Sequence, residues 1–258
     1  MIKFLEKLAR GSGKILLEYL NKTNKISIKK DLGYVGEADI ASENYIISKI
    51  EKHFPKSKII AEEKGILDPK KNLSRLTWII DPLDGTTNYI HDFPFFCISI
   101  GVMENNKLIA GVVFDPIKKE LYSAEINKGA FLNKNKINVS KIKSFKDSLL
   151  ITGFYYHQGN KLKNQIKRFM HVQDITKSVR RLGAAALDIC YVACGRADGF
   201  WEEGVKSWDV AGGTIILLES CGKFTDFKGN PGNIFGNEFV YTNGFIHENL
   251  LKTLNYKT

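Results

Sequence analysis

The chain has 258 residues, of which 43% are hydrophobic and 26% charged, and its formal net charge is +10. This length and balance are ordinary for a globular protein that buries a substantial core. No apolar run approaches the roughly 20 residues of a membrane span, so the composition excludes a membrane-spanning protein.

The predicted elements of the first half begin with an amphipathic helix. Charged and apolar residues alternate at helical spacing through the first 20 residues, which is unlike a signal peptide and favours a cytoplasmic protein. Apolar runs joined by turn residues then predict an antiparallel meander. In chain order we expect helices over 1–20 and 37–54, a strand over 58–61, a polar loop over 64–74, a buried strand over 76–80 and antiparallel strands between 95 and 139.

The second half returns to alternating strands and helices. We expect strands over 149–151, 198–202 and 239–241, and helices over 160–171, 183–194, 208–221 and 246–254. Helices that alternate with two sheets predict an α/β (α+β) layered sandwich whose first sheet is antiparallel. No repeat or linker divides the chain, so we predict a single domain over 1–258, with an α+β half to about residue 145 and an α/β half from about residue 146.

The positive charge does not by itself predict a nucleic-acid partner. The lysines are scattered, and no basic stripe alternates with aromatic residues. Contact with nucleic acid or with the transcription machinery stays open without a motif to support it. The four cysteines form no C-x-x-C pair and do not predict a zinc site.

Residues 81–89, with the sequence DPLDGTTNY, are the most informative stretch. Asp81 and Asp84 stand where a buried strand ends, and carboxylates in such a place can hold divalent cations. Gly85 and Thr86 open a predicted helical turn, whose free N–H groups can bind a phosphate. A metal site and a phosphate site in one short segment predict phosphoryl chemistry.

Two further acidic elements strengthen this interpretation. Glu62 and Glu63 follow the predicted strand at 58–61, and Asp209 opens a helix in the segment KSWDVAGG, residues 206–213. Taken alone, Asp209 is typical of a helix N-cap, and the two glutamates are typical of a solvated loop. Converging carboxylates repel one another by about 4 kcal/mol per pair at 4 Å and an effective dielectric of 20, and magnesium removes that repulsion.

The DPLDGTTNY segment, the upstream Glu62–Glu63 pair and the downstream WDVAG segment together resemble the inositol monophosphatase family. Its members are magnesium-dependent, lithium-sensitive phosphatases of sugar and polyol phosphates. The resemblance runs from Asp39 through Gly213 with fitting spacing. It implies an αβαβα sandwich that assembles as a homodimer and acts on a small-molecule phosphate monoester.

The resemblance also implies a ligand set for two or three Mg²⁺ ions per site. The first ion would bind Glu62, Asp81 and the carbonyl of Leu83. The second ion would bind Asp81, Asp84 and Asp209. A third, weaker ion would lie near Glu62. Two such ions clamp the phosphate, activate the attacking water and stabilise the departing oxygen.

Further roles follow from the same resemblance. Glu62 and Thr86 would activate the nucleophilic water, and Asp39 would hydrogen-bond Thr86. The N–H groups of Gly85 and Thr86 would hold the phosphate. The remaining implied contacts, with the leaving alcohol, involve Asp84, Ala184, Ala185 and Glu202, although Glu202 is equally typical of an exposed acid at a strand end.

The substrate and the mechanism leave alternatives. Some inositol-specific relatives have a serine near residues 152–156, where this chain has aromatic residues. Fructose-1,6-bisphosphate, adenosine bisphosphate and histidinol phosphate therefore remain open as substrates, and a transcription role beside catalysis remains open too. A phosphatase that forms a phospho-aspartate is a rival, but its Asp-x-Asp motif differs from the spacing of Asp81 and Asp84.

Overall fold

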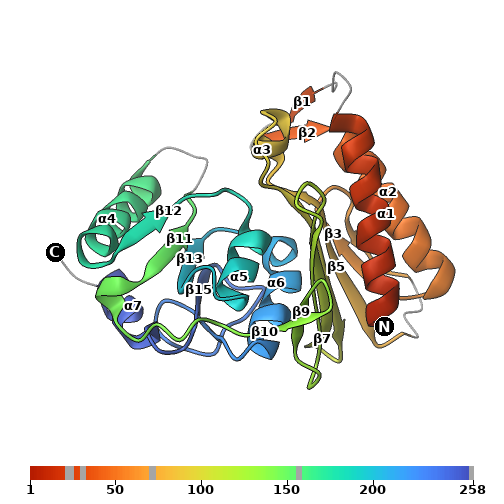
Figure 1. The fold of residues 1–258 in the computed structure, drawn as a ribbon. Helices are drawn as coiled ribbons and strands as arrows, with labels where there is room; N and C mark the ends of the chain where they lie inside the picture. The colour runs from red at the N-terminus through yellow and green to blue at the C-terminus, as the bar shows by residue number, and fades with distance from the viewer. Residues whose placement is uncertain (21–25, 30–32, 70–73, 155–158, 256–258) are drawn as a thin grey trace.

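The computed structural model describes residues 1–20, 26–29, 33–69, 74–154 and 159–255. Its helices and sheets stack in five layers (Figure 1), which confirms the predicted αβαβα sandwich. One helical pair covers the first sheet, a second pair lies between the two sheets, and a third covers the outer face of the second sheet. These pairs are α1 (Ile2–Leu20) with α2 (Glu37–His53), α5 (Ala185–Ala193) with α6 (Ser207–Glu219), and α4 (Asn160–Ile175) with α7 (His247–Leu254).

The first sheet has eight strands in the order β10-β9-β8-β7-β6-β5-β3-β4. Every neighbouring pair is antiparallel except β3 and β5, which are parallel. The predicted antiparallel meander is therefore confirmed. The strands are β3 (Lys58–Ala61), β4 (Gly65–Leu67), β5 (Leu76–Asp84), β6 (Cys97–Glu104), β7 (Lys107–Asp115), β8 (Glu120–Glu125), β9 (Ala130–Leu132) and β10 (Asn135–Ile137).

The second sheet has five strands in the order β12-β11-β13-β15-β14 and mixes parallel with antiparallel pairs. A separate two-stranded hairpin precedes α2. The remaining elements are β1 (Ile26–Lys29), β2 (Gly33–Gly36), α3 (Thr86–Ile90), the 3₁₀ turn η1 (Phe145–Asp147), β11 (Leu149–Thr152), β12 (Ser178–Arg180), β13 (Gly199–Glu203), β14 (Lys223–Thr225) and β15 (Glu238–Thr242). Among the described residues, no helix has both the length and the apolar character that crossing a bilayer requires.

The predicted polar loop over 64–74 is wrong at its start. Residues Gly65–Leu67 form β4, an edge strand that folds back antiparallel on β3, with Ala61 opposite Gly65. Three residues are too short for alternation to reveal a strand in a polar surrounding. The part of that loop at 70–73 lies outside the described residues.

Helix α6 approaches the first sheet unusually closely because small residues line the contact. A Cβ added to Gly101 on β6 would lie 2.7 Å from the Cβ of Ala211. A Cβ added to Gly212 would lie 3.0 Å from the carbonyl oxygen of Val112 on β7. Neither added atom fits without movement, so the backbone of α6 packs directly on the sheet. This contact carries the first turn of α6 to the end of β5.

Candidate active site

The parallel pairing of β3 and β5 brings Glu62 beside Asp81. Ala61 lies opposite Ile80, so the next residue of each strand emerges at the same edge of the sheet. The N–H of Glu62 still donates to the carbonyl of Ile80, at 3.3 Å. The register therefore brings the two residues to the same edge of the sheet, where the charge of Glu62 raises the pKa of Asp81.

A β-bulge separates Asp81 from Asp84. On the neighbouring strand their partners are Ser99 and Cys97, so two residues of β5 face one residue of β6. In a regular strand, side chains three positions apart point to opposite faces. The bulge interrupts that alternation, and the charge of Asp84 raises the pKa of Asp81.

Asp209 lies in the first turn of α6, three residues after the helix cap. Its Oδ2 accepts a hydrogen bond from the backbone N–H of Lys206, at 2.6 Å. The N-cap is therefore Lys206, and Asp209 is the third residue of a capping box instead of the N-cap that its sequence position suggested. Burial raises the pKa of Asp209 to about 6, although the Lys206 N–H and the side chain of Asp81 both act to lower it.

Asp84 joins the strand end to the N-terminus of α5. Its Oδ1 accepts the N–H of Ala185 at 3.2 Å, and its Oδ2 accepts the N–H of Ala186 at 2.7 Å. Free N–H groups at a helix start favour a carboxylate. Asp84 and the predicted substrate-contact backbone at Ala184–Ala185 therefore lie together, and Ala184 itself is the buried N-cap of α5.

The buried carboxylates oppose one another's ionisation. Burial raises the pKa of Asp81 well above its usual range, and the charges of Glu62, Asp84, Asp209 and Asp39 raise it further. Bound divalent cations would remove this repulsion. The donors are carboxylate and carbonyl oxygens, which suit magnesium better than zinc with its preference for nitrogen and sulfur.

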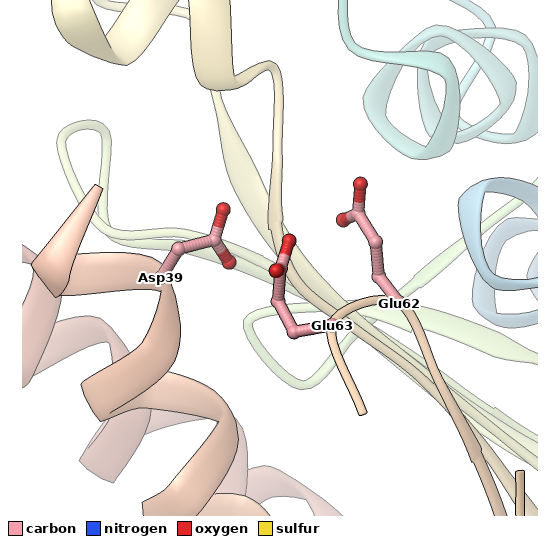
Figure 2. A group of neighbouring side chains, drawn as sticks. All are labelled: Asp39, Glu62 and Glu63. Carbon is pink, nitrogen blue, oxygen red and sulfur yellow. The ribbon is translucent and has the colours of Figure 1, made fainter. Parts of the chain in front are cut away.

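Asp39, Glu62 and Glu63 form a second acidic group at the same edge (Figure 2). One oxygen of each lies within 4.8 Å of the others, close enough to hold a cation. Asp39 comes from the start of α2, while both glutamates follow β3. In the sequence, Glu63 stands out only as the second residue of the Glu62–Glu63 pair. Its adjacency to Asp39 depends on how α2 packs against the sheet, which no local pattern reveals.

Thr86 and Gly85 shape the turn after the two aspartates. The Thr86 hydroxyl donates to the carbonyl of Leu83 at 3.1 Å. Gly85 has φ +91°, and a Cβ there would lie 3.0 Å from the carbonyl oxygen of Phe95, so only glycine fits easily. The predicted hydrogen bond between Asp39 and Thr86 stays a prediction.

Glu202 lies on β13, where its carboxylate packs over Gly153. It is half-buried, unlike the exposed acid that its strand-end position suggested. Burial and, to a smaller extent, the charge of Asp209 raise its pKa to about 8, while Arg181 acts to lower it. Asp188 on α5 is a further buried acid, and its pKa is raised by burial, then by Glu202. No pattern in the sequence marks Asp188, because a single acid within an apolar helix carries no motif.

Comparisons with known proteins agree with this geometry. The model of the inositol monophosphatase family matches residues 1–257. The Nus factor SuhB of Pseudomonas aeruginosa is 36% identical, over 98% of this chain and 95% of that protein. The fructose-1,6-bisphosphatase/inositol-1-monophosphatase of Thermotoga maritima is 36% identical, over 98% of this chain and 95% of its own length. The structure of an inositol monophosphatase from Anabaena (Nostoc) is 39% identical with a TM-score of 0.87, covering 98% of this chain and 94% of that one.

The protein combines a layered α/β fold with carboxylates at the end of β5, and these relatives match it over nearly its whole length. These features define a phosphatase that hydrolyses phosphate monoesters. The chain belongs to the inositol monophosphatase family. The resemblance drawn from the DPLDGTTNY and WDVAG segments is therefore confirmed.

Proposed function

We propose that the protein is a magnesium-dependent phosphatase of inositol monophosphate or a related polyol or sugar phosphate. The observation that carries the proposal is the convergence of Glu62, Asp81, Asp84 and Asp209 at the end of β5, where the charges of the other three raise the pKa of Asp81. Two or three Mg²⁺ ions, when bound, would neutralise these acids, polarise the phosphate and increase the acidity of the attacking water.

The family resemblance supplies the proposed ligands, and the effect of the charges of Glu62, Asp84 and Asp209 on the pKa of Asp81 supports them. Glu62, Asp81 and the Leu83 carbonyl would hold one ion, and Asp81, Asp84 and Asp209 another. Asp84 already accepts two N–H groups, and a carboxylate has lone pairs left for a cation. Glu63 and Asp39 would support a weaker ion beside Glu62, since the three carboxylates lie together.

The residues around the ligands would place water and phosphate. We assign Glu62 and Thr86 to orienting the attacking water, with Asp39 behind them. The N–H groups of Gly85 and Thr86 would hold phosphate oxygens. This assignment is supported by the family match and by the turn geometry that brings Thr86 next to Leu83.

The leaving alcohol would face Asp84, Glu202 and the backbone at Ala184 and Ala185. A carboxylate such as that of Glu202 can accept from two adjacent hydroxyl groups of a polyol. Because the Ala185 N–H already donates to Asp84, the backbone contribution to substrate would come mainly through neighbouring groups of the α5 N-terminus.

The test is a panel of phosphate monoesters assayed with magnesium, with and without lithium. We expect inositol monophosphate to be hydrolysed and lithium to inhibit. Asp81→Asn should reduce turnover by roughly 100-fold or more, since losing a ligand should exceed the 10–100-fold cost of losing an outer partner, while the variant stays folded.

Asp115→Asn is the matched control for that variant. Asp115 is also a buried aspartate, but its Oδ1 accepts the N–H groups of Ile117 and Lys118, both at 2.9 Å, in the turn between β7 and β8. Near-normal turnover by Asp81→Asn, or equal losses in both variants, would reject the assignment.

The names of relatives support a second substrate and a second role. The Thermotoga relative is named for fructose-1,6-bisphosphate as well, so this sugar bisphosphate belongs in the panel. The Pseudomonas relative is named as a Nus factor, which supports testing contact with the transcription machinery.

The family resemblance further supports a homodimer. The four free cysteines are consistent with a cytoplasmic location.

A further inference from the structure

One turn of α2 presents three polar side chains to the site. Asp39, Ser42 and Glu43 are spaced i, i+3 and i+4, so they share one face of the helix. All three are buried, at 1%, 0% and 1% exposure. Further along the same helix the buried positions are apolar, at Ile46, Ile47 and Ile50. The buried face of α2 thus changes from apolar to polar as it reaches the strand ends.

Glu43 binds the turn that follows Glu62. Its Oε2 accepts the N–H of Glu63 at 2.8 Å, and its Oε1 accepts the N–H of Lys64 at 3.0 Å. Both oxygens of one carboxylate therefore hold two consecutive N–H groups. Burial raises the pKa of the Glu43 carboxyl, and these two N–H groups act against that rise because they stabilise its ionised form.

The neighbouring residue of α2, Ser42, binds a second segment that carries proposed ligands. The Ser42 hydroxyl donates to the carbonyl of Pro82, at 3.0 Å, and Ser12 of α1 lies 2.6 Å from it, hydroxyl to hydroxyl. Pro82 stands between Asp81 and Leu83. Two consecutive residues of α2 thus bind two of the three chain segments that carry the proposed magnesium ligands, the third being the first turn of α6.

A buried glutamate at this place has a cost that packing alone does not explain. Removing a carboxylate from water is unfavourable, whereas an apolar residue there would continue the core of α2 without that cost. What Glu43 provides instead is a fixed position for the short turn between β3 and β4. Ligands held in place before binding lose less conformational freedom when the ion arrives.

We propose that Glu43 is a positioning residue of the metal site, which holds the turn after β3 so that Glu62 faces the ions in its binding geometry. The inference rests on the proposed function. Glu43 itself touches neither ion nor substrate in this scheme; it acts through the backbone of Glu63 and Lys64.

The test measures Mg²⁺ binding by calorimetry on the full chain without substrate. Glu43→Gln keeps the size of the side chain but replaces one acceptor oxygen with an NH₂ group. We expect its Kd for Mg²⁺ to rise about 10-fold, the lower end of the effect of losing an outer-shell partner. Amide exchange at Glu63 and Lys64 should also become faster in the metal-free variant.

Glu219→Gln is the matched control. Glu219, on α6, likewise uses its carboxylate to hold a turn after a strand, accepting the N–H groups of Asn127, Lys128 and Gly129. That turn joins β8 to β9 and carries none of the proposed ligands. We expect this variant to keep the wild-type Kd for Mg²⁺.

A double-mutant cycle tests whether Glu43 affects Mg²⁺ binding through Glu62. In a Glu62→Gln background, adding Glu43→Gln should change the Kd by less than about twofold, because the ligand that Glu43 positions is gone. If Glu43→Gln does not fold, Glu43→Asp replaces it. The shorter side chain should weaken the hydrogen bonds to the N–H groups of Glu63 and Lys64.

The outcomes separate the inference from the proposed function. Unchanged Mg²⁺ affinity in the Glu43 variant, equal weakening in the Glu219 control, or an undiminished effect without Glu62 would each overturn the inference. Wild-type protein that binds Mg²⁺ but hydrolyses no phosphate ester would overturn the proposed function alone. Wild-type protein that binds no Mg²⁺ would overturn both.

Discussion

At the residue scale, burial decides which side chains ionise. His247 is fully buried between two hydroxyls, with Thr225 Oγ1 2.9 Å from its Nε2 and Thr242 Oγ1 2.8 Å from its Nδ1. Burial lowers its pKa to about 4, and the charge of Lys223 adds to that effect. An unfolded histidine has a pKa near 6.5, so the native state holds His247 neutral where the unfolded chain is protonated.

We predict that His247 destabilises the protein as the pH falls. Its contribution is fully present above pH 6.5 and is lost progressively toward pH 4, with a loss of about 2 kcal/mol by pH 5. His247→Gln should lack this loss. The measurement is urea unfolding of both proteins between pH 5 and 7.5 without metal, and the informative quantity is the difference in unfolding free energy between them.

The comparison of the two proteins is needed because the buried acids of the site change the unfolding free energy with pH in the opposite direction. Asp209 has a folded pKa of about 6, above its usual 3.8, so its contribution is present below pH 4 and is lost as the pH rises through 6. Both proteins share this term, and it cancels in the comparison. A difference that stays constant from pH 7.5 to 5 would contradict the role of His247.

At the element scale, the position of α6 depends on glycine. The contact of Gly101 with Ala211 sets how near α6 lies to β6, and therefore how near Asp209 lies to Asp81. Asp209 sits only two residues before Ala211, within the same helical turn. A small displacement of this helix would move a proposed ligand directly.

We predict that Gly101→Ala weakens both folding and metal binding. Overpacking of this kind costs about 1–3 kcal/mol, and the helix must shift to admit a methyl group that would otherwise lie 2.7 Å from Ala211. Thermal unfolding and Mg²⁺ calorimetry check the two effects. Leu218→Ala, on the exposed side of the same helix, is the control and should leave Mg²⁺ affinity unchanged. Wild-type affinity in Gly101→Ala would show that the close approach is not what places Asp209.

At the scale of the whole molecule, the site joins separate layers. Asp39 comes from a helix on the outer face of the first sheet, Asp81 from the sheet itself, and Asp209 from the helical layer between the sheets. A cation bound by such residues stabilises only the folded state, because the unfolded chain does not bring them together.

We predict that Mg²⁺ raises the unfolding temperature. At 100 times the Kd, one bound ion adds about 2.7 kcal/mol, which for a chain of this size corresponds to roughly 5–10 °C. Differential scanning calorimetry with Mg²⁺, against sodium chloride of equal ionic strength, provides the measurement. Asp209→Asn should lose most of the shift, and an equal shift with sodium chloride would contradict specific binding.

Strong local patterns in the sequence predicted most elements correctly. The helix at Glu37–His53 and the strand at Lys58–Ala61 follow from periodicity, because a run of suitably spaced apolar residues favours one structure regardless of its neighbours. β4 was missed, since an edge strand of three residues depends on its partner strand for stability. The family and the phosphatase class also followed from sequence alone, through the DPLDGTTNY and WDVAG segments.

The sequence predicts the residue types of the site, but tertiary structure determines how close these residues lie to one another. The bulge that re-aims Asp84 is a property of the pairing with β6, and the nearness of Asp209 is a property of glycine contacts between α6 and the first sheet. The contacts of Glu43 also depend on tertiary structure, because its hydrogen-bond partners lie outside α2. Propensity acts over a few neighbouring residues, whereas packing acts between segments far apart in the chain, and only packing sets the spacing between acids.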